Sequence, residues 1–264
     1  MVPAGGYRVV RDVPYGSLPR QQLDIYVPAE AGDAEPSRAP GPAPVIVFLY
    51  GGGWRAGSRT DYLFAGQAFA ARGYVTVIPD YRLYPDATFP LFLEDSAAAV
   101  AWARRFVAEY GGDARRIYLV GHSAGAYNAV MLTLDERWLA AAGLDARSDL
   151  RAAVGIAGPY DFLPLKSWLK PIFGVDGIDL ETTQPIAQVD GGEAPLLLAT
   201  GLSDDTVDPG NSRRLAARIR DKGGRVEERY YPNVTHLMVV GALAAPLRFL
   251  APVLDDTVDF LRRH

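Results

Sequence analysis

The sequence predicts an α/β fold with a mostly parallel sheet of eight strands and helices on both faces. Three observations lead to this fold class. Strand-like and helix-like segments alternate from residue 45 to the end of the chain. The segment VIVFLY (45–50) is an uninterrupted apolar run, which is typical of a strand buried on both faces. Two alternating segments within residues 7–28 surround a Gly/Pro turn and predict an antiparallel edge.

The elements follow from the apolar spacing and from the residues that end each segment. Gly73 ends a helix that begins near Asp61, and Gly111 with Gly112 ends a helix over 91–110. Further strands are expected at 74–81, 116–121, 150–158, 194–201 and 225–232, and further helices at 124–134, 211–224 and 247–263.

The length of 264 residues suits one large α/β domain or two small ones. Residues 29–44 are rich in Ala, Pro and Gly, and they favour a surface loop over a domain linker because the segment before them is too short to fold alone. We therefore predict a single domain over residues 1–264. The irregular segment 159–194 lies between two predicted strands, and an excursion there over the carboxyl edge of the sheet would form a small lid.

Composition narrows the classes of function. The chain has 27 Lys and Arg against 31 Asp and Glu, with no basic stripe, so nucleic acid is not an expected partner. The absence of Cys excludes disulfides, thiolate metal sites and a Cys nucleophile. No apolar run reaches the length of a membrane span, and the first ten residues carry no signal segment. We expect a cytoplasmic protein, although a removed leader would leave the same sequence, and composition does not define the oligomeric state.

The strongest chemical motif is GHSAG (121–125), which fits G-x-S-x-G directly between a predicted strand and a predicted helix. This is the context of a nucleophile elbow, in which a strained turn exposes the side chain of Ser123 and small neighbours let strand and helix approach closely. The alternative is a glycine-rich turn with a buried serine.

A serine nucleophile needs a base, and the chain has three histidines. His122 lies inside the elbow, where its side chain should point away from Ser123, and His264 is the terminal residue. His236 remains, in a loop after the last predicted strand. Without Ser123, a lone histidine in such a loop would be a surface or structural residue.

The histidine needs an orienting carboxylate, which in this kind of fold lies between serine and histidine in the chain. The segment GLSDDTVDPG (201–210) offers Asp204, Asp205 and Asp208 just past a strand end. Asp204 is the first carboxylate beyond the turn, so position favours it. Asp205 would face the other way, and Asp208 lies where it would cap the next helix.

The glycines of YGGGW (50–54) follow the apolar strand at once, and three interpretations compete: a phosphate-binding turn, a plain tight turn, or amides that stabilise an oxyanion. The G-K-[ST] sequence of a phosphate-binding P-loop is absent. A dinucleotide site is also not expected, because bulky Trp54 and Arg55 occupy the turn and no well-placed acidic residue follows about 20 residues later. A tetrahedral oxyanion needs fixed N–H donors. One is expected from Ala124, after the nucleophile, and the others from this loop.

These motifs resemble the α/β-hydrolase superfamily, in the branch of bacterial carboxylesterases near the hormone-sensitive-lipase and kynurenine-formamidase groups. The resemblance covers nearly the whole chain. The matching segments are YGSLPRQQLDIYVP (15–28), YGGGW (50–54), PDYRLYPDATFP (79–90), YGGDARRIYLVGHSAGA (110–126), GLSDDTV (201–207) and NVTH (233–236).

The resemblance implies an α/β-hydrolase fold with Asp204 as the acid and with the backbone amides of Gly52, Gly53 and Ala124 as oxyanion donors. It implies neither a cofactor nor a metal. The large N-terminal helical cap of hormone-sensitive lipases has no counterpart before the first strands, so any lid comes from 159–194. Tyr50 replaces the usual histidine of the glycine motif, and its phenol would hold the loop by a hydrogen bond or line the pocket.

Other polar and aromatic residues of the matched segments have less specific roles. We expect structural hydrogen bonds from Asp80, Arg82, Glu94, Asp95 and Asp161. The expected pocket residues, each of which would otherwise be core or lid packing, are Tyr50, Trp54, Tyr84, Phe89, Phe162, Trp168, Phe173, Leu237 and Met238.

The sequence thus predicts a serine carboxylesterase that acts on small to medium soluble carboxylic esters, with Ser123, Asp204 and His236 as its triad. An arylformamidase or another amide hydrolase would use the same triad. A non-catalytic ligand-binding member of the fold is the other class considered, and such proteins commonly lack the serine or the histidine.

Overall fold

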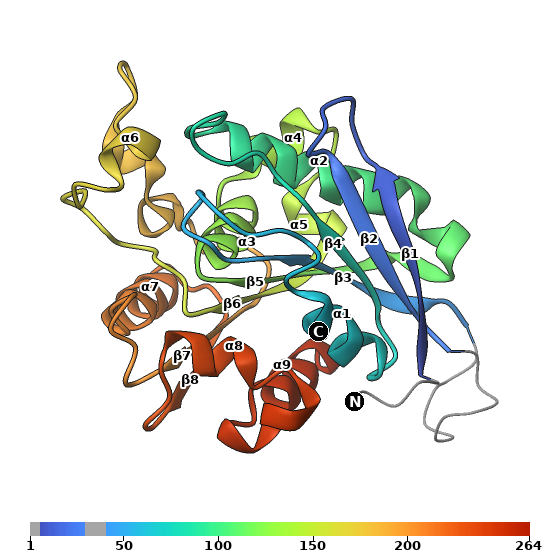
Figure 1. Ribbon diagram of the computed structural model, residues 1–264. Coiled ribbons are helices and arrows are strands. Elements are labelled where there is room, and N and C mark those ends of the chain that lie inside the picture. Colours follow the sequence, from blue (N-terminus) through green and yellow to red (C-terminus); the bar gives the residue numbers. More distant parts are fainter. Residues whose placement is uncertain (1–5, 30–40) are drawn as a thin grey trace.

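The computed structural model describes residues 6–29 and 41–264 (Figure 1). Its strands are β1 (Tyr7–Pro14), β2 (Gln22–Pro28), β3 (Ala43–Leu49), β4 (Val75–Pro79), β5 (Gly112–His122), β6 (Leu150–Ile156), β7 (Leu196–Gly201) and β8 (Val226–Tyr231). Its α-helices are α1 (Leu63–Ala70), α2 (Leu91–Phe106), α3 (Ala124–Leu134), α4 (Glu136–Ala141), α5 (Ala146–Asp149), α6 (Lys170–Phe173), α7 (Gly210–Asp221), α8 (His236–Gly241) and α9 (Val253–Arg262). Short 3₁₀ turns are η1 (Val107–Tyr110), η2 (Leu180–Thr183), η3 (Pro185–Gln188) and η4 (Ala245–Leu250).

The strands form one eight-stranded sheet in the order β1-β2-β4-β3-β5-β6-β7-β8. The β1–β2 and β2–β4 pairs are antiparallel, and the pairs from β4 through β8 are parallel. The predicted mostly parallel sheet with an antiparallel edge is therefore confirmed. In the sheet, β4 lies on one side of β3 and β5, the next strand in the chain, lies on the other side. The strand order therefore reverses at β3. Open α/β sheets bind ligands at such a reversal, beyond the carboxyl ends of the strands.

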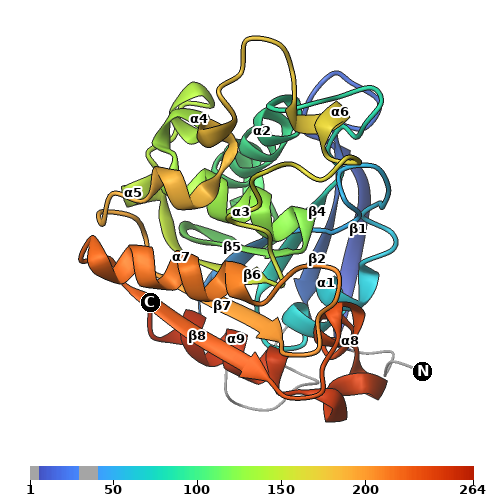
Figure 2. The same ribbon diagram turned by 90° about the vertical axis from the view of Figure 1, so that its left-hand side faces the viewer.

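Helices cover both faces of the sheet, as predicted. Figure 2 shows α1, α8 and α9 on one face and α2, α3 and α7 on the other. Alternate residues of β3 point to opposite faces: Ile46 and Phe48 belong to the apolar cluster that includes α1 and α9, whereas Val45 and Val47 belong to the cluster that includes α7. The uninterrupted apolar run of β3 is explained by this burial on both sides. Among the described helices, none combines the length and apolarity needed to cross a membrane.

Two differences from the sequence prediction have local causes. The single helix expected over 247–263 is divided into η4 and α9, because Pro252 has no amide to continue a helix and Ala251 before it is extended. His236 begins the short helix α8 instead of lying in a loop, with Thr235 as its N-cap. The surface loop expected at 29–44 lies largely outside the described residues.

A buried ion pair connects the segment after β4 to α2. Asp95 Oδ2 accepts from the backbone amide and from Nε of Arg82, both at 2.8 Å, and Asp95 Oδ1 accepts from Arg82 Nη2 at 2.9 Å and from Gln21 Nε2 at 2.8 Å. Glu94, the residue before Asp95 on the helix, reaches Arg82 only at 3.8 Å. The structural role expected for Asp95 and Arg82 matches these contacts.

Replacing Asp95 with Ala should lower the free energy of unfolding by about 2–3 kcal/mol, because the mutation leaves a mostly buried arginine and a half-buried glutamine without their acceptor. Glu94→Ala is the matched control, and its loss should stay below about 1 kcal/mol because the Glu94 side chain is 52% exposed. Urea denaturation of both variants tests this. Equal losses would contradict the central role of Asp95.

Candidate active site

A cavity of about 500 Å³ opens at the carboxyl ends of β3, β5 and β7. Its walls come from the glycine loop after β3, from the turn between β5 and α3, and from residues 159–169 at the start of the irregular segment. The start of α7 and the first residues of α8 complete it. The predicted excursion over this edge of the sheet thus supplies one wall of the cavity.

Ser123 lies on a sharp turn between β5 and α3. Its φ of 53° and ψ of −119° are rare for a residue with a side chain, as the nucleophile-elbow motif requires. The amide of Ser123 donates to the carbonyl of Ile156 on β6 at 2.8 Å, which holds the turn on the sheet. A Cβ on Gly125 would lie 2.0 Å from the carbonyl oxygen of Leu49, so only glycine lets α3 begin this close to β3.

Ser123, His236 and Asp204 form a continuous hydrogen-bonded row. His236 Nε2 lies 2.9 Å from Ser123 Oγ, and His236 Nδ1 lies 2.7 Å from Asp204 Oδ2. All three side chains are buried, yet Ser123 and His236 line the cavity. A carboxylate on Nδ1 selects the tautomer whose Nε2 is an acceptor, which is the arrangement that a general base for a serine requires.

The backbone brings the acid and histidine segments together. The amide of Ser203, one residue before Asp204, donates at 3.0 Å to the carbonyl of Val234, two residues before His236. Asp204 Oδ1 also accepts from the amides of Thr206 and Val207 at 3.0 and 2.9 Å. These bonds leave Oδ2 directed at the imidazole.

The two other candidate acids have different partners. Asp205 is exposed and accepts only a long bond from Thr206 Oγ1, at 3.4 Å, among the contacts described. Asp208 accepts from the amide of Gly210 at the start of α7 and pairs with Arg214. Asp204 alone of the three contacts His236.

The glycine loop borders the same cavity. Gly52 and Gly53 have φ values of 138° and 60°, and both line the cavity beside Ser123 and Ala124. Within the described residues, the amides of Gly52, Gly53 and Ala124 donate no hydrogen bond. They are therefore available to an acceptor that enters the cavity.

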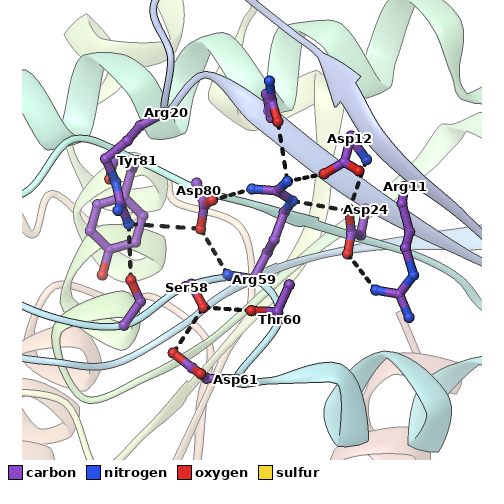
Figure 3. Close-up of polar contacts among 12 residues, drawn as sticks. Arg11, Asp12, Arg20, Asp24, Ser58, Arg59, Thr60, Asp61, Asp80 and Tyr81 are labelled. Carbon is purple, nitrogen blue, oxygen red and sulfur yellow. Dashed lines mark hydrogen bonds and ion pairs between the residues drawn. The ribbon is translucent and has the colours of Figure 1, made fainter.

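Arg20, in the connection between β1 and β2, supports the glycine loop from behind. It donates to the carbonyls of Tyr81 and Gly57 and to the phenol of Tyr50, at 2.9, 2.9 and 2.8 Å. Arg59, just past the loop, pairs with Asp12, Asp24 and Asp80 (Figure 3). Asp80 and Arg82 are absent from the cavity wall, in agreement with a structural role.

Four of the nine residues expected in the pocket line the cavity, and five lie elsewhere. Trp54, Phe162, Trp168 and Leu237 line the cavity. Tyr50, Tyr84, Phe89 and Met238 do not, and neither does Phe173.

The five residues that do not line the cavity have other contacts. Tyr50 is fully buried, stacks on Tyr81 with ring centroids 4.7 Å apart, and directs its phenol at Arg20. Tyr84 carries the guanidinium of Arg55 over its ring. Phe89 is packed edge-on against Trp138, and Phe173 against Trp54. Met238 packs against the apolar core.

Several residues that line the cavity carry no recognisable signal in the sequence. Tyr62 lines the cavity from the position before α1, where it looked like an ordinary residue of a predicted helix. Leu163 and Leu169 lie within the irregular segment, whose composition marked the region without singling them out. Asp161, expected to anchor a loop, lines the cavity and pairs with Arg214 of α7.

The fold and the site together define the α/β-hydrolase class: a mostly parallel sheet, a serine on a strained strand–turn–helix elbow, and a Ser–His–Asp row at its carboxyl edge. Residues 23–219 match the family model described as BD-FAE, and the chain belongs to that family.

Relatives and solved structures have esterase names. The chain is 30% identical over 250 residues to a probable isoprenylcysteine alpha-carbonyl methylesterase of Oryza sativa subsp. japonica, a match that covers 87% of this chain and 57% of that protein. It is 30% identical to esterase LipC of Mycobacterium tuberculosis, over 80% of this chain and 55% of that one. The chain thus spans little more than half the length of these relatives. A propionate-bound esterase of Thermogutta terrifontis has 25% identity and a TM-score of 0.74 over 98% of this chain and 94% of its own.

His122 is buried on the cavity wall beside His236, and its imidazole is neutral near pH 7. Burial lowers its pKa to about 3, and the nearby His236 acts in the same direction. Between about pH 6.5 and pH 3 the unfolded chain therefore binds a proton at this residue that the folded chain does not bind. Stability rises with pH wherever the unfolded state binds more protons, so His122 lowers stability as the pH falls below 6.5.

Replacing His122 with Gln should remove this part of the acid sensitivity. From pH 7 to pH 5, the wild type should lose about 2 kcal/mol more free energy of unfolding than His122→Gln loses. Urea denaturation of both proteins at the two pH values measures the difference. Parallel losses would contradict a neutral, buried His122.

Proposed function

We propose that this protein is a serine carboxylesterase that hydrolyses small to medium soluble carboxylic esters through an acyl-enzyme intermediate. The observation that carries the proposal is the row from Asp204 Oδ2 through His236 to Ser123 Oγ, with separations of 2.7 and 2.9 Å, at the wall of a cavity. Membership of the BD-FAE family and the esterase names of relatives support it.

In the proposed reaction, His236 Nε2 takes the proton of Ser123 Oγ while the oxygen attacks the ester carbonyl carbon. The carbonyl oxygen becomes an oxyanion and accepts hydrogen bonds from the amides of Gly52, Gly53 and Ala124. As the carbon–oxygen ester bond breaks, the alcohol leaves with the proton from His236. Water then attacks the acyl-enzyme, gives its proton to His236, and the acid is released as Ser123 recovers that proton. Asp204 holds the imidazole and stabilises its charged form.

The cavity supports the proposed substrate class. A volume of about 500 Å³ accommodates a small or medium ester, and Trp54, Phe162, Leu163 and Leu169 provide apolar walls. The propionate in the Thermogutta terrifontis structure is a short acyl acid. We further propose that the chain acts as one domain whose segment 159–194 serves as a small lid, because residues of this segment complete the cavity.

Hydrolysis of p-nitrophenyl esters from C2 to C16 tests the function, with Ser123→Ala beside the wild type. We expect the highest rates at short acyl chains and a loss of about 10⁵–10⁶-fold in kcat for Ser123→Ala, because the variant has no nucleophile. Full activity in Ser123→Ala would refute the mechanism. Labelling of Ser123 by a fluorophosphonate without turnover of any ester would refute the substrate class and favour formamides and amides.

Asp204→Asn should lower kcat by about 10⁴-fold, because an amide on Nδ1 favours the wrong imidazole tautomer. Asp205→Asn is the matched control, since it makes the same change on the neighbouring exposed residue, and it should retain nearly full kcat. Steady-state kinetics on one short ester compare the two variants. A larger loss in Asp205→Asn would transfer the role of the acid to that residue.

A further inference from the structure

His122 lies at the centre of the site, although the proposed reaction gives it no role. Its side chain is 2% exposed, it lines the cavity, and its ring centroid lies 4.9 Å from that of His236. A polar ring in this place needs hydrogen-bond partners, since water is nearly excluded from it.

Both ring nitrogens of His122 have partners, and these partners define its tautomer. His122 Nε2 lies 3.3 Å from the backbone carbonyl oxygen of His236, and His122 Nδ1 lies 3.0 Å from the phenol oxygen of Tyr62. A carbonyl oxygen only accepts, so the proton is on Nε2. Nδ1 is then the acceptor, and the hydroxyl of Tyr62 is its donor.

Tyr62 connects this pair to the glycine loop. Burial raises the pKa of Tyr62 to about 12, so its phenol keeps the proton that it donates to His122. The ring of Tyr62 is stacked between Tyr50 and Phe64, with centroids 5.8 and 5.5 Å away. Packing on Tyr50, at the start of the glycine loop, therefore fixes the ring, and the hydroxyl of Tyr62 contacts His122.

We propose that Tyr62 and His122 are positioning residues. They form a bridge from Tyr50, at the start of the glycine loop, through the stacked ring of Tyr62 and the ring of His122 to the His236 carbonyl, and this bridge fixes the base relative to the oxyanion loop. This inference rests on the proposed function. The bridge holds the first residue of α8, so the imidazole of His236 keeps its distance to Ser123 Oγ while the glycine loop stays beside the same oxygen. Misplacement of reacting groups by a fraction of a bond length is costly in rate, which gives such a bridge its value.

The neutral state of His122 fits the bridge. When His236 accepts the serine proton it becomes a cation beside the His122 ring. A second imidazolium at that distance would oppose the charge. Because burial keeps the pKa of His122 far below that of an ordinary histidine, its ring adds no like charge at neutral pH.

Kinetics of four variants test the bridge. Tyr62→Phe keeps the stacked ring and removes the hydroxyl, so kcat should fall about tenfold with KM changed less than about twofold. His122→Asn places an amide at the Nδ1 position and removes the donor to the His236 carbonyl. The kcat of this variant should fall by a similar factor. His122→Gln places an amide at the Nε2 position and should retain more of kcat than His122→Asn. Tyr74→Phe is the control, since it removes a buried phenol from outside the cavity wall, and it should retain wild-type kcat.

Two kinetic outcomes would overturn the bridge: equal kcat in Tyr62→Phe and Tyr74→Phe, or a His122→Gln variant as slow as His122→Asn. Fluorophosphonate labelling of each variant separates a slower reaction from a loss of active protein, because a positioning defect slows labelling while its final extent stays at that of the wild type.

Nitrogen-15 NMR of the imidazoles tests the tautomer without any substrate, and the chain has only three histidines to assign. We expect His122 to stay neutral with its proton on Nε2 at pH 5–8, and its Nδ1 resonance to move downfield in Tyr62→Phe as the hydrogen bond is lost. A proton on Nδ1 would overturn the bridge even if Tyr62→Phe failed to fold. The expected tautomer in a protein that hydrolyses no ester would instead refute the proposed function and leave the bridge in place.

Discussion

Helix α3 begins against the end of strand β3, and the position of the rest of the site follows from that contact. A Cβ on Gly125 would lie 2.0 Å from the carbonyl oxygen of Leu49 and 2.4 Å from that of Tyr50, so a larger residue would push the helix away from the strand. Ser123 lies two residues before Gly125 in the chain. The glycine loop begins directly after Tyr50, on the other partner of the same contact. The serine and the amides proposed to stabilise the oxyanion are therefore held by the same rigid junction, and little reorganisation is left for the reaction itself.

The fold and the row of three residues were within reach of the sequence because their signals are short-range. A strand, a G-x-S-x-G turn and a helix follow one another within about twenty residues, and the count of three histidines left His236 as the base. Position favoured Asp204 but did not exclude Asp205 or Asp208. The structure separates them through the contact of Asp204 Oδ2 with His236 Nδ1, which spans 32 residues of sequence and is contained in no local pattern.

The pocket was less predictable, because residue type does not state where a side chain points. Phe89 and Phe162 are both aromatic and both lie near the carboxyl edge, yet Phe162 lines the cavity and Phe89 packs against Trp138. Tyr62 escaped notice for the same reason. Its hydrogen bond to His122 spans 60 residues of sequence, and only the assembled sheet brings the two together.

The N-terminal strand pair has a larger part in the site than an edge of a sheet suggests. In the carboxylesterase families that the chain resembles, a histidine shapes the glycine loop; here Tyr50 occupies that position and its phenol accepts from Arg20, which comes from the β1–β2 connection. Arg20 also holds the Gly57 carbonyl, so one side chain fixes the loop near both of its ends.

The guanidinium of Arg20 lies beside the buried stack of Tyr50 and Tyr81, so its positive charge needs a nearby negative charge. Asp80 provides it at 3.8 Å, and Asp80 in turn shares Arg59 with Asp24 of β2 and Asp12 of β1 (Figure 3). The network ties the first two strands, the end of β4 and the glycine loop into one unit. The positive charges of Arg20 and Arg59, which support the glycine loop, are balanced by carboxylates of β1, of β2 and of the end of β4. The antiparallel edge of the sheet therefore helps to hold the proposed oxyanion donors in place.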